Sequence, residues 1–166
     1  MTTSSKIVSS RLIVILAILI TVACADKEAN PNAQGNIDVV QMEVFKQPSC
    51  KCCDKWVDHV KEAGFEVNTK KRMNLDAIKQ EFDVAPRYQS CHTGVVDGYV
   101  FEGHIPARLI RQFLEETPVD ARGLAVPGMP VGSPGMEMGE RVDSYDVLLL
   151  KNDGTSEVYA HIDGSE

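Results

Sequence analysis

The stretch VVQMEVFKQPSCKCCDKWVDHVKEAG, residues 39–64, decides the fold expected for this chain. Apolar residues alternate with polar ones along residues 39–46, which predicts a strand. Pro48 breaks that pattern, and from Cys53 to Gly64 the apolar residues recur at helical spacing. Three cysteines therefore lie where a strand passes into a helix.

The pattern continues on both sides of this stretch in the order β-α-β-α-β-β-α. The next expected elements are a strand over 65–69, a helix capped by Asn74, a hairpin over 93–102 around Asp97-Gly98, and a helix that opens at Pro106. Residues 123–139 are rich in Gly, Pro and Met and look too broken for regular structure, and a last hairpin is expected over 146–161. We predict the α/β class: a thioredoxin-like domain with a Met/Pro/Gly-rich loop and a C-terminal β-hairpin.

The N-terminus has the pattern of a signal peptide. Two basic residues precede an apolar run over 12–20, and small residues follow it. One interpretation is cleavage before Asp26, which gives a soluble periplasmic protein. The other treats Val22-Ala23-Cys24 as a lipobox, so that Cys24 anchors the protein to the envelope through a lipid. We therefore expect a signal peptide at 1–25, a polar linker at 26–38 and the thioredoxin-like domain at 39–163.

The charge argues against nucleic acid as a partner. The whole chain has a formal net charge of −7, and removal of Lys6 and Arg11 with the leader takes it to −7 − 2 = −9. Phosphate binding requires a concentrated positive surface, which this balance does not suggest.

The cysteines point to soft-metal chemistry. Cys50 and Cys53 form a C-x-x-C pair just ahead of a helix, whose dipole lowers thiol pKa values, and this suits a redox pair or a metal site. Cys52 favours the metal, because a dithiol enzyme has no obvious use for a third adjacent sulfur. Cys91 and His92 precede the first hairpin, in a loop that faces the C-x-x-C turn in thioredoxin-like folds. We predict Cys50, Cys52, Cys53, Cys91 and His92 as metal ligands; a structural disulfide with a spare thiol remains the alternative.

Copper(I) is the preferred metal and zinc the second choice. Both favour thiolates, but adjacent cysteines rarely close one tetrahedral zinc site, whereas bridging thiolates in a copper(I) cluster need no fixed spacing. Met129, Met136 and Met138 offer weaker candidate thioether ligands, or else they fill gaps under the loop. We expect His104 to be a surface or packing residue, or one that orients a ligand, and His59 to lie outside the site.

Five blocks in order resemble the CopG-type family of copper-resistance and metal-binding proteins, over about Met42 to His161. They are PSCKCC (48–53) with KWV (55–57), SCHT (90–93), EGHIP (102–106), GLAVPGMP (123–130) and SYDV (144–147). The resemblance implies a thioredoxin-like fold, a periplasmic location, copper-binding sulfurs at Cys50, Cys52, Cys53 and Cys91, and partners among copper-efflux or multicopper oxidase components.

Two functions follow as hypotheses. In the first, the protein binds copper(I) in a thiolate site for copper resistance or homeostasis. In the second, it is a thiol-disulfide or copper oxidoreductase that uses Cys50 and Cys53.

Overall fold

The structure, a computed structural model, describes residues 39–164. The expected signal peptide at 1–25, the lipobox at Cys24 and the linker at 26–38 lie outside the described residues. Within the described range, no helix has both the length and the apolar character needed to cross a membrane.

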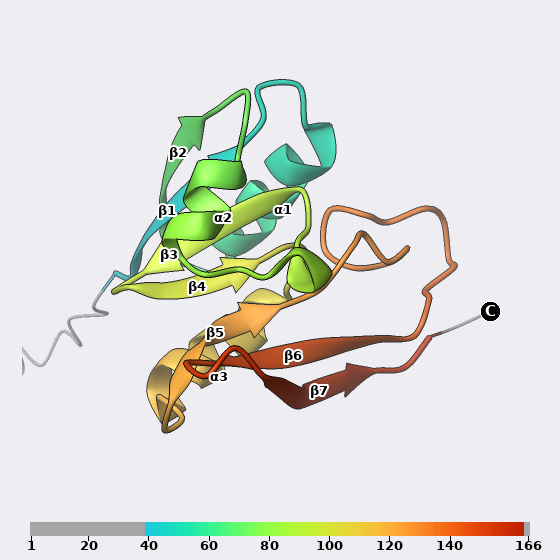
Figure 1. The fold of residues 1–166 in the computed structure, drawn as a ribbon. Helices are drawn as coiled ribbons and strands as arrows, with labels where there is room; N and C mark the ends of the chain where they lie inside the picture. The colour runs from blue at the N-terminus through green and yellow to red at the C-terminus, as the bar shows by residue number, and fades with distance from the viewer. Residues whose placement is uncertain (1–38, 165–166) are drawn as a thin grey trace, which may run out of the picture. The chain divides into compact units, whose positions relative to one another are not determined.

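A seven-stranded sheet, in the order β2-β1-β3-β4-β5-β6-β7, forms the centre of the domain (Figure 1). β1 pairs in parallel with β2, β4 pairs in parallel with β5, and the remaining neighbours are antiparallel. The strands are β1 (Gln41–Lys46), β2 (Glu66–Lys71), β3 (His92–Val96), β4 (Tyr99–Glu102), β5 (Ala121–Ala125), β6 (Tyr145–Lys151) and β7 (Ser156–Ile162).

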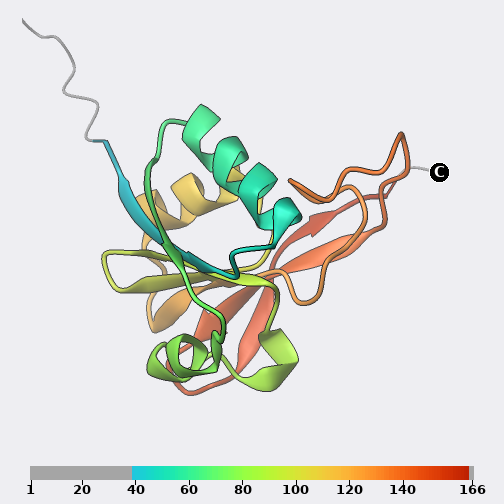
Figure 2. The same ribbon diagram turned by 90° about the horizontal axis from the view of Figure 1, so that it is seen from above.

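The helices cover both faces of the sheet. α1 (Lys51–Glu62) and α3 (Ala107–Glu116) lie on one face, while α2 (Asp76–Glu81) and the 3₁₀ turn η1 (Pro86–Tyr88) lie on the other (Figure 2). Successive strand residues serve opposite faces, as the pleat requires: Phe101 joins the core under α1 and α3, and Val100 joins the core with Tyr88. The sheet is thus buried between two apolar cores.

Trp56 anchors α1 to the larger core. Its side chain is fully buried, and its ring nitrogen donates a hydrogen bond of 2.9 Å to the carbonyl of Ile105. A buried indole N–H needs such a partner, so this bond fixes α1 against the segment that leads into α3. The prediction of Trp56 as a core residue is confirmed.

The mixed α/β class, the two hairpins and the strand-to-helix position of the cysteines are confirmed. The helix begins earlier than expected, at Lys51, so Cys52 and Cys53 lie in its first turn. The N-cap position of α2 falls on Leu75 and not on Asn74 as predicted, but the Asn74 side-chain oxygen accepts a hydrogen bond of 2.7 Å from the backbone N–H of Asp76, the first residue of the helix.

The prediction that residues 123–139 carry no regular structure is wrong at its start, because β5 continues to Ala125. Gly123 made the segment look like a loop, yet its lack of a side chain is what allows the pairing with β4. A Cβ there would lie 1.8 Å from the carbonyl oxygen of Val100. Glycine in a strand can mark a close approach of two backbones. The Met/Pro/Gly-rich loop proper runs over 126–144, between β5 and β6.

Candidate metal centre

The cysteine turn is held at the N-terminus of α1. Cys50 is the N-cap residue with extended backbone angles, its N–H donates to the carbonyl of Gln47 (3.2 Å), and its carbonyl accepts from Asp54 (3.3 Å). Cys52 and Cys53 follow in the first turn, where backbone N–H groups lack partners and favour negative charge. Cys53 is fully buried, while Cys50 and Cys52 are half-buried.

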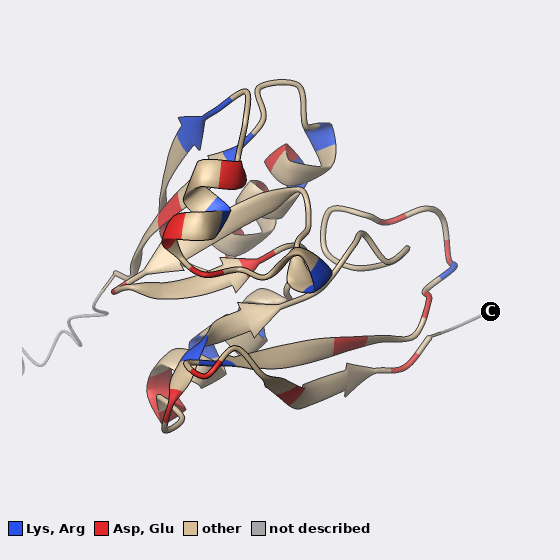
Figure 3. Ribbon diagram, in the orientation of Figure 1, with Lys and Arg blue, Asp and Glu red and all other residues tan. Residues whose placement is uncertain are grey.

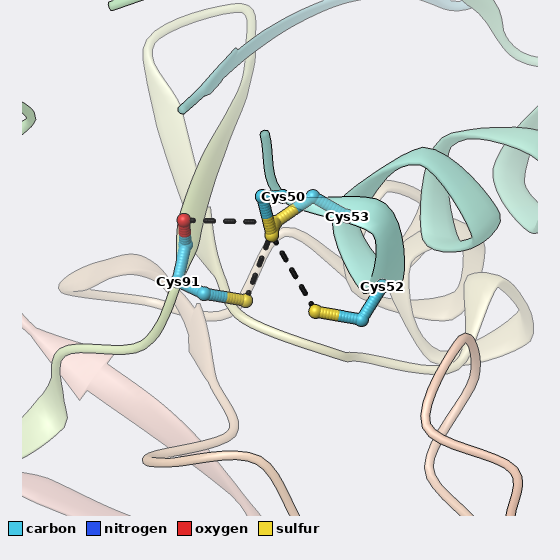
Figure 4. Close-up of side chains that lie close together, drawn as sticks. All are labelled: Cys50, Cys52, Cys53 and Cys91. Atoms are coloured by element: carbon cyan, nitrogen blue, oxygen red, sulfur yellow. Dashed lines mark hydrogen bonds between the residues drawn. A yellow bond between two sulfur atoms is a disulfide. The ribbon is translucent and has the colours of Figure 1, made fainter. Parts of the chain in front are cut away.

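Cys91 reaches the same place from the loop before β3. Its Sγ lies 3.4 Å from Cys53 Sγ, and Cys50 Sγ lies 3.4 Å from Cys52 Sγ. All four sulfurs lie within 4.8 Å of one another (Figure 4). Two segments almost forty residues apart in the sequence therefore deliver a compact set of soft donors.

Two of these sulfurs are bonded to each other. Cys50 and Cys53 form a disulfide, and Cys52 and Cys91 are free thiols. A disulfide sulfur is not a thiolate, and thiolates are the form that metals bind. In this state the turn offers two thiols, and reduction would offer four.

Two histidines extend the donor set beyond the cysteines. Cys91 Sγ lies 3.0 Å from His104 Nε2 and 3.4 Å from His92 Nδ1, and these three residues form a second group whose donor atoms lie within 4.8 Å. Both imidazoles are fully buried, and their ring centroids are 4.9 Å apart. His92 Nε2 has no hydrogen-bond partner despite its burial. Since buried polar atoms are nearly always satisfied, this nitrogen is a candidate ligand atom.

His104 is buried, which corrects the expectation of a surface role. Its Nδ1 bonds to the carbonyl of Pro134 at 2.8 Å; a carbonyl only accepts, so Nδ1 carries the proton. Nε2 is then the unprotonated nitrogen, and it faces Cys91. A histidine whose second ring nitrogen is tied to a carbonyl is the usual arrangement at metal sites.

Burial sets the protonation of these groups. Burial, with a smaller effect from the charge and the hydrogen bond of Cys52, raises the pKa of the Cys91 thiol to about 12. Burial also lowers the pKa of His92 well below its usual value and lowers the pKa of His104. The imidazoles are therefore neutral, as a metal requires, while Cys91 must lose a proton when a metal binds.

The Met/Pro/Gly-rich loop closes over the centre through its backbone rather than its methionines. Beside the Pro134 contact, a Cβ on Gly135 would lie 2.7 Å from the carbonyl oxygen of Cys52 and 2.9 Å from the N of Trp56. Met129 and Met138 are exposed and Met136 is half-buried. Their role as ligands stays a prediction.

A buried ion pair, which the sequence reasoning missed, supports the Cys91 loop. Lys79 of α2 and Glu102 of β4 are both buried and form a close ion pair. The Glu102 carboxylate also accepts from the N–H of Ser90 (2.6 Å) and the hydroxyl of Thr93 (2.6 Å), the residues on either side of Cys91 and His92. A signal was present, because Lys79 lies four residues after Leu75 on the inner face of α2.

His59 lies outside the centre, as expected. Its Nε2 accepts a hydrogen bond of 3.0 Å from the N–H of Ala107, the first residue of α3. The ring thus satisfies a free N–H at a helix start.

The comparisons with known proteins agree on one family. Residues 88–136 match the profile of a family described as a protein of unknown function, DUF411. No curated protein matches this sequence. Two solved structures, described as copper resistance protein CopG form 2 and form 1, are 41% and 42% identical to this chain, with TM-scores of 0.72 and 0.71. Each match covers 75% of this chain, and 99% and 98% of the respective solved chain.

Proposed function

The chain belongs to the family of the copper resistance protein CopG, and from this premise we propose that it is a periplasmic protein that binds copper(I) through cysteine thiolates for copper resistance or homeostasis. The observation that carries the proposal is the set of four sulfurs within 4.8 Å, drawn from α1 and the loop before β3. We propose Cys50, Cys52, Cys53 and Cys91 as the thiolate ligands.

The histidines complete the proposed site. His92 offers its unpartnered Nε2 and His104 its unprotonated Nε2. The methionines at 129, 136 and 138 remain weaker candidate ligands. Copper(I) fits this set better than zinc, because adjacent cysteines suit bridging thiolates more than one tetrahedral ion.

We extend the proposal to the fold and the location. The order β2-β1-β3-β4, with β1 parallel to β2 and antiparallel to β3, supports a thioredoxin-like core over the first part of the 39–163 domain. The sequence of residues 1–25 supports export, with cleavage before Asp26 or lipidation at Cys24 as its two outcomes. Copper-efflux or multicopper oxidase components are the proposed partners.

The second candidate function is a thiol-disulfide or copper oxidoreductase. The Cys50–Cys53 disulfide at the start of α1 favours it, because a C-x-x-C disulfide at a helix N-terminus is suited to redox exchange. Cys52, which is outside the disulfide, distinguishes the two functions: copper binding would use its thiolate as a ligand, whereas disulfide exchange would not need it.

The decisive experiment is an anaerobic copper(I) titration of the reduced domain, followed by elemental analysis and X-ray absorption at the copper edge. We expect several coppers per chain with sulfur-dominated shells and short copper–copper distances. Cys52→Ser should lower the copper stoichiometry, with Ser49→Ala as the matched control for a change in the turn. Normal loading of Cys52→Ser, together with turnover of the Cys50–Cys53 disulfide, would support the oxidoreductase instead.

A further inference from the structure

A polar pocket of about 520 Å³ opens beside the cysteine turn. Its walls come from the loop after β1, the segment before α2 and the loop before β3, and they include Gln47, Cys50, Met73, Asn74, Gln89 and Cys91. The volume is in the range of about 300–1,000 Å³ that binds small organic molecules. Copper binding does not account for a pocket of this size, because a copper ion needs no such space.

The pocket gives access to only one half of the disulfide. Cys50 is half-buried and lines the pocket, whereas Cys53 is fully buried and does not line it. Thiol–disulfide exchange proceeds by attack of a thiolate on one sulfur, and access decides which sulfur is attacked. A thiolate held in the pocket therefore meets Cys50 and displaces Cys53. The start of α1 stabilises the thiolate of Cys53 that leaves.

Basic residues border the pocket, although the two charged residues that line it are Asp76, which is acidic, and Lys79, which is paired with Glu102. Lys71 and Arg72 directly precede Met73, which lines the pocket. Figure 3 shows basic residues at the end of β2 and at the start of α1. This charge favours an anionic ligand.

We propose that the pocket binds an anionic low-molecular-weight thiol, which opens the Cys50–Cys53 disulfide. The inference deepens the proposed function, since only the opened disulfide provides four thiolates for copper. In the first step, the ligand thiolate bonds to Cys50 Sγ, the Cys50–Cys53 bond breaks, and Cys53 leaves as a thiolate. In the second step, another ligand thiolate attacks the ligand's own sulfur in the mixed disulfide and releases Cys50 as a thiolate. Two thiols are oxidised to one small disulfide, and one protein disulfide is reduced.

Glutathione is the probe for the test. The full mature protein, oxidised, is mixed with glutathione, quenched in acid, alkylated and mapped by mass spectrometry. We expect the transient glutathione adduct on Cys50. An adduct found mainly on Cys53 would overturn the proposal, because it would place the attack outside the pocket.

Two variants test the pocket itself. Met73 is 80% exposed and lines the pocket, so Met73→Trp fills its mouth without disturbing the core. We expect this variant to react with glutathione about tenfold more slowly, and to be reduced by a phosphine at the rate of the wild-type protein. Val119→Trp is the matched control, because Val119 is 87% exposed and does not line the pocket. Equal glutathione rates in the wild-type protein and in Met73→Trp would overturn the proposal.

A comparison of an anionic with a cationic thiol tests the charge of the ligand. At equal thiolate concentration, glutathione should react faster than the cationic thiol cysteamine, and the double variant Lys71→Gln/Arg72→Gln should lose this preference. Lys61→Gln, in the last turn of α1, should keep it. A preference that the double variant retains would contradict an anionic ligand. Copper(I) loading of the phosphine-reduced wild-type protein is measured separately. A failure to bind copper would reject the proposed function, whereas the exchange rates alone decide whether the pocket binds the thiol.

Discussion

At the scale of single residues, His104 has the most direct consequence for the site. It bonds to Pro134 through Nδ1 and approaches Cys91 through Nε2. We expect His104→Leu, which keeps the volume and removes both nitrogens, to weaken copper(I) binding about 10–100-fold, the usual effect of losing a group that orients or completes a metal site. Competition with a copper(I) chelator under anaerobic conditions measures this affinity. The exposed His161 provides the control variant His161→Leu, and equal affinities for the two variants would contradict a role for His104.

The raised pKa of Cys91 predicts how copper binding depends on pH. Its thiol has a pKa raised to about 12 by burial and by Cys52, so without metal it keeps its proton at neutral pH. Copper must displace that proton, and the affinity should therefore increase as the pH rises from about 6 to about 9, by about tenfold per pH unit for each proton released. Cys91→Ser should lower this slope by one proton. An unchanged slope in Cys91→Ser would show that Cys91 binds copper without losing a proton or does not bind it.

At the scale of elements, local patterns were enough to predict most of the chain. Alternation and turn residues gave both hairpins, and the break at Pro48 placed the cysteines at the start of a helix. β5 was missed because the glycine at 123 is required by the close backbone of Val100 in β4. No local sequence pattern records that contact. The spacing of Lys79 from Leu75 indicated its burial, but its partner Glu102 lies in β4, and only the fold brings the two together.

The site shows the same division between local and distant information. The three cysteines of the turn and Cys91 were predictable from their residue types and from the expected element order. His104 was not, because its role depends on the Pro134 carbonyl, thirty residues later in a loop without regular structure. Sequence reasoning thus predicted that the four sulfurs lie together, and it missed the contact that orients the buried imidazole beside them.

The loop over 126–144 yields a prediction with an internal control. Gly135 has a φ of +87° and no room for a side chain, while Gly139 has a φ of +67° and a Cβ there would meet nothing within 4 Å. Both Gly→Ala changes carry the strain of a positive φ, about 1 kcal/mol, but only Gly135→Ala also pushes the loop away from Cys52. We expect Gly135→Ala to lose more stability in urea unfolding and to weaken copper(I) binding. If both variants lose the same stability and bind copper equally, the loop does not support the site.

At the scale of the whole molecule, copper binding and redox state should both act on stability. A ligand that binds only the folded state stabilises it, by about 2.7 kcal/mol when its free concentration is 100 times its Kd. Reduction would free all four thiols, whereas the disulfide form has two free thiols, Cys52 and Cys91. We therefore expect copper(I) to raise the thermal unfolding midpoint of the reduced protein strongly and that of the oxidised protein weakly, in anaerobic thermal unfolding with each form prepared beforehand.

Zinc and the variant Cys53→Ser complete that experiment. Zinc should stabilise the reduced protein less than copper(I), because the adjacent cysteines fit one tetrahedral ion poorly. Cys53→Ser cannot form the Cys50–Cys53 disulfide, so its response to copper should no longer depend on the redox state. It should also fall below that of the reduced wild-type protein, since one sulfur of the four is lost. Equal stabilisation of the oxidised and reduced wild-type proteins would mean that copper binds without the two sulfurs of the disulfide, and the centre would then have to be sought at Cys91, His92 and His104.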